Sequence, residues 1–182
     1  HGKTFRLPET NAILQFLEET FCAIPAYKDR SPLDKAKVNA VKDASLMFID
    51  FFWEFYWAEN WTEADALQRR EARSHTWLEQ MDNYLKTIDT ALLLTDPIEG
   101  AGTTLTAAAA VLFEALEIVD NQFPGAVTKH PEVAAIHSKI LNRPRVAEYL
   151  KAGKREALIT LSSLETAEKR AAATETWKAA AK

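Results

Sequence analysis

The chain has 182 residues, of which 47% are hydrophobic and 26% are charged, close to the composition of ordinary globular proteins. This composition excludes wholesale disorder, and 5 glycines with 7 prolines exclude a collagen-like or low-complexity chain. The net charge is −4 and no basic stripe is present, so nucleic acid is not an expected partner.

The cysteine content and the apolar stretches bear on the compartment. The single cysteine, Cys22, cannot form an internal disulfide and favours a reducing compartment. The longest apolar stretch, residues 46–58, is interrupted by Asp50 and Glu54 and is too short to span a bilayer. We therefore expect a soluble cytoplasmic protein, with a mitochondrial one that has lost a presequence as the alternative.

The first part of the chain predicts a short strand and a helix. Residues 3–7 alternate between polar and apolar, which is typical of a strand. A helix is expected after Pro8, with Thr10 as its N-cap. Its apolar face consists of Ile13, Leu14, Phe16 and Leu17. Pro25 and Pro32 then bracket a segment with the character of a linker.

The rest of the chain is expected to be helical. A long helix should run from Pro32, capped by Ser31, to about Glu59, and it is apolar on nearly all sides. The later helices are expected from Thr62 to about Leu94, from Thr106 to about Asn121, and from Pro131, Pro144 and Ser162 onward. In the helix from Pro144 we expect Val146, Tyr149 and Leu150 to face inward.

Histidine and cysteine side chains give no catalytic or metal-binding pattern. His130 and His137 lack a cysteine or carboxylate at metal-ligand spacing, so surface or cap positions are expected for both and no metal is predicted. Cys22 has no nearby histidine or helix start that would lower its pKa, so a structural thiol is favoured over a nucleophile.

Two other features could form a binding site. The aromatic run of residues 51–57 is too large for one helix face, so Phe52, Trp53 and Tyr56 could line an apolar ligand pocket or a subunit interface, although core packing is the alternative for each. At Glu9 and Thr10, a helix N-terminus, a hydroxyl and a carboxylate together suit the head group of an α-amino acid, although ordinary capping also explains Thr10.

Residues 7–17, Leu-Pro-Glu-Thr-Asn-Ala-Ile-Leu-Gln-Phe-Leu, resemble the Glu/Gln-Ser/Thr-x-Ala-Ile-x-x-(aromatic)-Leu motif of glutathione S-transferases. In that family the motif ends the thioredoxin-like domain, and its acidic and hydroxyl residues hold the γ-glutamyl group of glutathione. The later segments 105–109, 131–140 and 143–150 are similar to the family's buried sixth helix and its last two core helices, so the resemblance covers roughly residues 3–155.

The chain differs from the family pattern at two places that matter for function and stability. The strands with the family's catalytic Tyr, Ser or Cys would precede His1, so no catalytic residue is expected in these 182 residues. Ala109 stands where the family has a capping-box aspartate, so the N–H of Thr106 should lack a partner. On that basis Ala109→Asp is expected to stabilise the fold by about 0.5–1 kcal/mol.

The resemblance implies a fold, a domain organisation and a function. The fold is mainly all-α: a helical bundle like the C-terminal domain of glutathione S-transferases, preceded by a remnant strand and helix of a thioredoxin-like α/β domain. Residues 1–21 would form the end of that domain, and residues 22–31 would be a linker. Residues 32–155 would form the helical bundle, and residues 156–182 a helical tail.

The implied function is conjugation of glutathione to hydrophobic electrophiles, provided that the missing N-terminal half of the protein is supplied. Glutathione, the co-substrate, would bind at Glu9 and Thr10, and the electrophile near Phe52, Trp53 and Tyr56. The resemblance also implies a homodimer. The alternative is a non-catalytic relative that serves as an assembly module or subunit of a larger complex. A third hypothesis, a ligand-carrying helical bundle, depends on the aromatic residues alone.

Overall fold

The computed structural model describes residues 30–57, 64–94 and 105–152, without the side chains of residues 53–57 and 64–66. Its elements are α3 (Pro32–Trp57), α4 (Ala64–Leu85), η1 (Thr90–Leu92), α5 (Ala107–Gln122), η2 (Val127–Lys129), α6 (Pro131–Leu141) and α7 (Pro144–Lys151). Strand-like pairing in these ranges is limited to one isolated bridge, between Leu94 and Leu105. The predicted helical fold is confirmed, and the predicted strand and helix of residues 1–21 lie outside the described residues.

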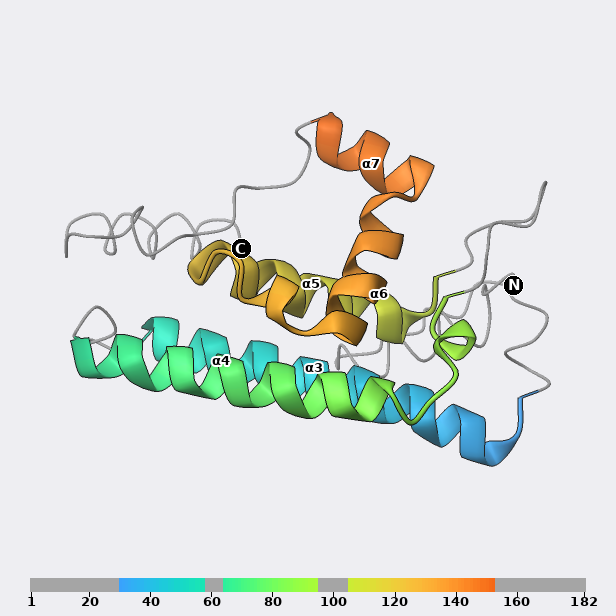
Figure 1. Cartoon of the computed structure of the whole chain (residues 1–182), viewed down its shortest axis with the longest axis horizontal. Coiled ribbons are helices and arrows are strands. Elements are labelled where there is room, and N and C mark those ends of the chain that lie inside the picture. Colours follow the sequence, from blue (N-terminus) through green and yellow to red (C-terminus); the bar gives the residue numbers. More distant parts are fainter. Residues whose placement is uncertain (1–29, 58–63, 95–104, 153–182) are drawn as a thin grey trace, which may run out of the picture.

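The helices form two layers (Figure 1). α3 and α4 run antiparallel. The end of α4 lies beside the start of α3, where the Tyr84 hydroxyl donates to the Lys37 carbonyl at 3.3 Å. α5 packs along α3, and α6 packs on α4 and α5. α7 projects away from this body at the top of Figure 1. No helix in the described ranges is both long and apolar enough to cross a bilayer.

The core lies between the two layers, on the faces that the apolar spacing predicts. It includes Val38, Val41, Phe48 and Phe52 of α3, Leu78, Met81 and Leu85 of α4, Leu112, Leu116 and Val119 of α5, and Val133, Ile136 and Ile140 of α6. α5 is the most deeply buried of these helices because both α3 and α6 pack against it.

The start of α3 is fixed by Ser31, as the sequence predicts. The Asp34 N–H donates to the Ser31 hydroxyl at 3.1 Å, and this hydroxyl donates to the Asp34 carboxylate at 2.8 Å. The carboxylate also lies near the positive end of the helix dipole. Local side-chain chemistry therefore accounts for this helix start.

The predicted continuation of α4 to Leu94 is wrong, because the helix ends at Leu85. The Thr87 hydroxyl donates to the Tyr84 carbonyl at 2.6 Å, and the Asp89 carboxylate accepts the Ala91 N–H at 2.9 Å. These short-range bonds replace helical ones and redirect the chain into η1. Ile88 is still buried, so the apolar stripe that suggested a longer helix continues through a turn.

The prediction for α7 is also corrected. The helix begins at Pro144 as expected, but none of its residues is buried. Val146 packs partly against the core, whereas Tyr149 is 48% exposed. α7 contacts α6 and then projects away from the bundle, so Tyr149 stays at the surface although Val146 near the start of α7 reaches the core.

Candidate functional site

The predicted site residues fall in different parts of the chain. Glu9 and Thr10 lie outside the described residues. Trp53 and Tyr56 belong to the last turns of α3, where only the backbone is described. Phe52 is 3% exposed and packs in the core, with its ring 6.5 Å from that of Phe48. Its part in a ligand pocket stays a prediction.

An apolar groove of about 300 Å³ lies between α3 and α4. It is lined by Ala40, Ala44, Trp77, Gln80, Met81 and Tyr84. The two alanines lie one helical turn apart on the same side of α3, and their small side chains leave room between the helices. Met47, one further turn along this side, is 70% exposed. The groove and this side chain together form an apolar surface on the α3–α4 layer.

Trp77 adds a hydrogen-bond donor to the lining of the groove. Its indole stacks on Phe48 with ring centroids 4.3 Å apart, and the residue is 8% exposed. The indole Nε1 is buried and has no acceptor in the described part of the chain. A buried donor without an acceptor carries an energetic cost, which a ligand or a partner chain could remove.

A carboxylate on α4 holds the start of α6. One oxygen of Asp82 accepts the backbone N–H groups of Glu132 and Val133, at 2.8 and 3.2 Å, and the other accepts from Lys86 Nζ at 2.8 Å. Burial raises the pKa of Asp82, but the bonds from Lys86, Val133 and Glu132 outweigh it, so the pKa lies below its usual value. Sequence analysis missed this residue, although an aspartate beside Met81 on the buried side of a helix is a detectable signal.

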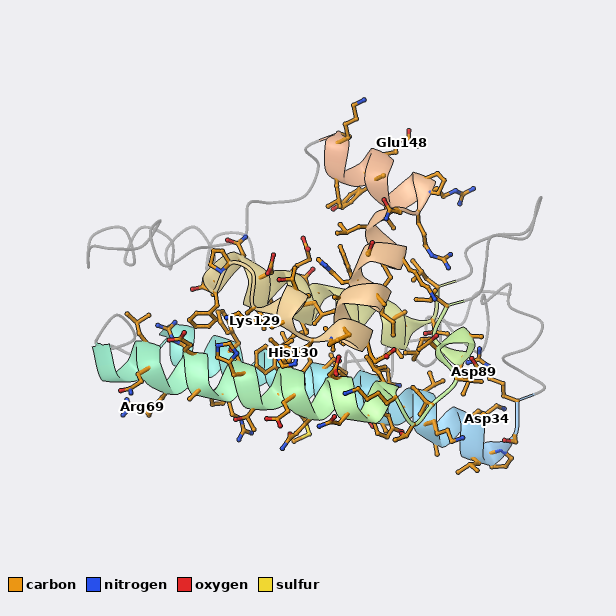
Figure 2. All side chains as sticks on the ribbon, viewed as in Figure 1. Asp34, Arg69, Asp89, Lys129, His130 and Glu148 are labelled. Carbon is orange, nitrogen blue, oxygen red and sulfur yellow. The ribbon has the colours of Figure 1, made fainter. Side chains whose placement is uncertain are left out.

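The two histidines differ from each other in the structure. His130, labelled in Figure 2, occupies the N-cap position of α6, but its side chain makes no capping bond there. His137 is mostly buried: its Nε2 lies 2.7 Å from the Glu117 carboxylate, and its ring stacks on Phe113. The expected surface position of His137 is therefore wrong, because Glu117 comes from α5, 20 residues earlier, and spacing along the chain does not show the pair.

The start of α5 has a threonine cap, but Ala109 stands where a capping box would have an acidic residue. The Thr106 hydroxyl accepts the Ala109 N–H at 3.1 Å and donates to the Leu93 carbonyl at 2.8 Å. The Thr106 N–H also donates to the Leu93 carbonyl, at 3.1 Å. The expectation that this N–H lacks a partner is therefore wrong, because the chain after η1 supplies the acceptor that an aspartate would otherwise provide.

Among the side chains that the structure describes, no three His, Cys, Asp or Glu residues come together in a way that could hold a metal ion. The site features that remain are an apolar groove, a helix with an aromatic end and buried polar groups that link the helices.

The geometry defines a class of protein: a helical bundle built on a long antiparallel helix pair, with a deeply buried central helix that begins at a threonine cap. The family model for the glutathione S-transferase C-terminal domain matches residues 51–153, more than half of the chain. The protein therefore belongs to the glutathione S-transferase family. Comparison with curated protein sequences gave no match. The family match starts inside α3, so the resemblance of residues 3–50 stays a prediction.

Proposed function

We propose that the protein is a glutathione S-transferase-like enzyme that conjugates glutathione to hydrophobic electrophiles once a complete thioredoxin-like domain is supplied. The observation that carries this proposal is the family match over residues 51–153, which includes the aromatic end of α3 and the buried helix α5. Mainly helical folding over the same range supports it.

The proposed glutathione site consists of Glu9 and Thr10. The backbone N–H groups at the start of the predicted helix and the Thr10 hydroxyl would take the γ-glutamyl carboxylate, while Glu9 would pair with the ammonium group. The sulfur of the bound thiolate would then form a bond to the electrophilic carbon, and the leaving group would depart with its bonding electrons. The catalytic residue of the thioredoxin-like domain would take the thiol proton.

The proposed wall for the hydrophobic substrate is the last part of α3. Phe48 and Phe52 hold this helix to the core, which fixes the backbone positions of Trp53 and Tyr56 beyond them. An apolar wall excludes water from the attacking thiolate and the electrophile. We place the substrate near Trp53 and Tyr56 because Phe52 itself faces the core.

We further propose that the groove between α3 and α4 binds a second copy of the chain. Its apolar lining and the exposed Met47 suit a protein interface, in which aromatic and methionine side chains are enriched. The buried Nε1 of Trp77 would gain an acceptor from the partner. A homodimer is also what resemblance to the family implies.

Calorimetric titration of the native-length protein with glutathione tests the proposed site. Glu9→Ala should weaken binding about ten- to hundredfold, since a lost hydrogen bond to a charged group typically costs about 1.5–3 kcal/mol. Glu18→Ala, a glutamate-to-alanine change in the same predicted helix, is the matched control and should leave binding unchanged. Binding that ignores Glu9→Ala would remove Glu9 from the site.

The alternative function, a non-catalytic assembly module, is favoured by one observation, the apolar groove with its buried indole donor. A protein that assembles through this groove but shows no glutathione binding in the titration would match the alternative. Glutathione binding that depends on Glu9 would favour the enzyme.

A further inference from the structure

The exposed residues of α3 beyond its first turn lie in one row. Among the described side chains they are Ala36, Ala40, Asp43, Met47 and Asp50. They follow each other at intervals of three or four residues and so share one side of the helix. Ala40 lines the groove, which places this row along the α3 border of the groove. Both charged members of the row are acidic.

The exposed row on the α4 border of the groove carries the opposite charge. Its members are Arg69, Arg73, Thr76, Gln80 and Asn83, again spaced by three or four residues. Gln80 lines the groove, so this row runs along its α4 border. Both charged members of the row are arginines. The groove is therefore bordered by negative charge on α3 and by positive charge on α4.

Asp50 and Arg73 lie at the same level of the helix pair. The Arg73 guanidinium lies 5.2 Å from the centre of the Phe51 ring, and Phe51 adjoins Asp50 in α3. The antiparallel register continues along the pair, where Phe48 stacks on Trp77. Asp50 is exposed and forms no hydrogen bond or ion pair within the described part of the chain, so its carboxylate is available to a partner.

Two copies of this face can meet with two-fold symmetry in two orientations. A two-fold axis parallel to the helices places α3 of one copy on α4 of the other at the same level, so that Asp50 meets the partner's Arg73 in two equivalent contacts. An axis across the helices places α3 on α3, and the acidic row then faces an acidic row. Opposite charges favour the first orientation and like charges disfavour the second.

We propose that two copies of the chain pair face to face, with α3 of each copy on α4 of the other, and that Asp50 and the partner's Arg73 fix this orientation. The inference rests on the proposed function, in which the groove binds a second copy, and it adds which residues of that copy bind. Met47, which adjoins Phe48 in α3, then lies at the level of the partner's Trp77. The apolar groove contributes buried area, and the charge pairs determine the orientation.

A charge swap between two chains tests this orientation. In Asp50→Arg, an arginine faces the partner's Arg73 in both contacts, and in Arg73→Asp, an aspartate faces the partner's Asp50 in both. Each variant should dimerise at least about tenfold more weakly than the wild type in sedimentation, because like charges then meet twice. A mixture of the two variants should recover the dimer, since the new arginine meets the new aspartate in one contact and the native pair forms the other. The double variant alone should recover it as well.

Glu148→Arg is the matched control, because it makes the same change of charge on α7, away from the α3–α4 layer (Figure 2), and it should leave the dimer unchanged. The substituted positions are exposed, so circular dichroism should show wild-type folding for every variant. Dimers that survive both single variants, or a mixture that stays monomeric, would overturn the proposal.

The same measurements distinguish failure of this inference from failure of the proposed groove interface. A dimer that is disrupted by Ala40→Glu but by neither charge variant would keep the groove as the interface and reject only this orientation. A wild type that is monomeric would reject both. Glutathione titration of the same samples tests the proposed enzyme separately.

Discussion

Asp82 joins α4 to α6 through one carboxylate, which accepts from a residue 50 positions later in the chain. Its bonds to Glu132 and Val133 satisfy backbone donors at the start of α6, which no side chain of α6 caps. We expect Asp82→Ala to lower the free energy of unfolding by about 1–3 kcal/mol, since it removes a cap and leaves buried N–H groups unsatisfied. Urea unfolding measures this, with the exposed Glu79→Ala on the same helix as the control. Equal losses in the two variants would contradict the assignment.

The contribution of Asp82 should depend on pH in a defined direction. Its folded-state pKa is lowered by the bonds that outweigh burial, so it lies below the unfolded value of about 3.9. A lowered pKa means that the carboxylate stabilises the fold fully above the unfolded pKa and loses this effect as the pH falls through the folded pKa. The difference between wild type and Asp82→Ala should therefore stay constant from about pH 5 to 7 and shrink below about pH 4.

Ala109 tests the changed interpretation of the α5 cap. The residue is fully buried, and the Thr106 N–H already donates to Leu93, so a new carboxylate finds no free donor there. We expect Ala109→Asp to lower the free energy of unfolding by about 1–3 kcal/mol, because the new side chain overpacks the site and buries a charge. Ala110→Asp is the matched control, because Ala110 is exposed one residue later and should change stability by less than about 0.5 kcal/mol. Stabilisation by Ala109→Asp would contradict this expectation and would support a capping box between Thr106 and the new aspartate.

At the scale of elements, the turn after α5 depends on Gly125. Its φ of +80° lies in the left-handed region, and its N–H donates to the Asp120 carboxylate at 3.0 Å. A Cβ there would meet Thr128 Oγ1 at 3.9 Å, an ordinary contact, so only the backbone conformation penalises a side chain. Gly125→Ala should cost about 1–2 kcal/mol in unfolding free energy, and Gly125→Asn less, since asparagine tolerates this conformation. Equal cost for alanine and asparagine would argue against a conformational origin.

The starts of the helices were predictable and one helix end was not. Ser31, Thr106, Pro131 and Pro144 act within one turn of their own position, so the sequence carries these signals locally. The end of α4 depends on Thr87 and Asp89, whose bonds to nearby backbone compete with a helix that the apolar stripe would continue. Burial at Ile88 is compatible with both conformations, so periodicity alone could not distinguish them.

The polar contacts between helices could not be predicted from the sequence. Asp82 with α6, and Glu117 with His137, each join residues 20 or more positions apart, and only packing of α4, α5 and α6 brings them together. The groove between α3 and α4 likewise arises from the alanines of one helix facing Trp77 of the other. Apolar spacing predicted which faces are buried but not which polar groups meet there.

At the scale of the whole molecule, the groove should decide the oligomeric state. Ala40 lines it and is exposed, so Ala40→Glu should leave the fold intact while it places a charge in the proposed subunit contact. We expect the wild type to sediment as a dimer at micromolar concentration and to have a melting temperature that rises with protein concentration. Ala40→Glu should sediment as a monomer and lose this dependence, because an uncompensated buried charge strongly disfavours association.

Ala135→Glu provides the control for charge alone, because Ala135 is exposed on α6, away from the groove. This variant should remain dimeric with the melting behaviour of the wild type. A dimer that survives Ala40→Glu would place the interface on another surface, and a wild type that is monomeric at every concentration would remove the homodimer altogether. In either case Trp77 Nε1 would still have no acceptor within the described part of the chain, since its burial beside Phe48 follows from the fold of one chain.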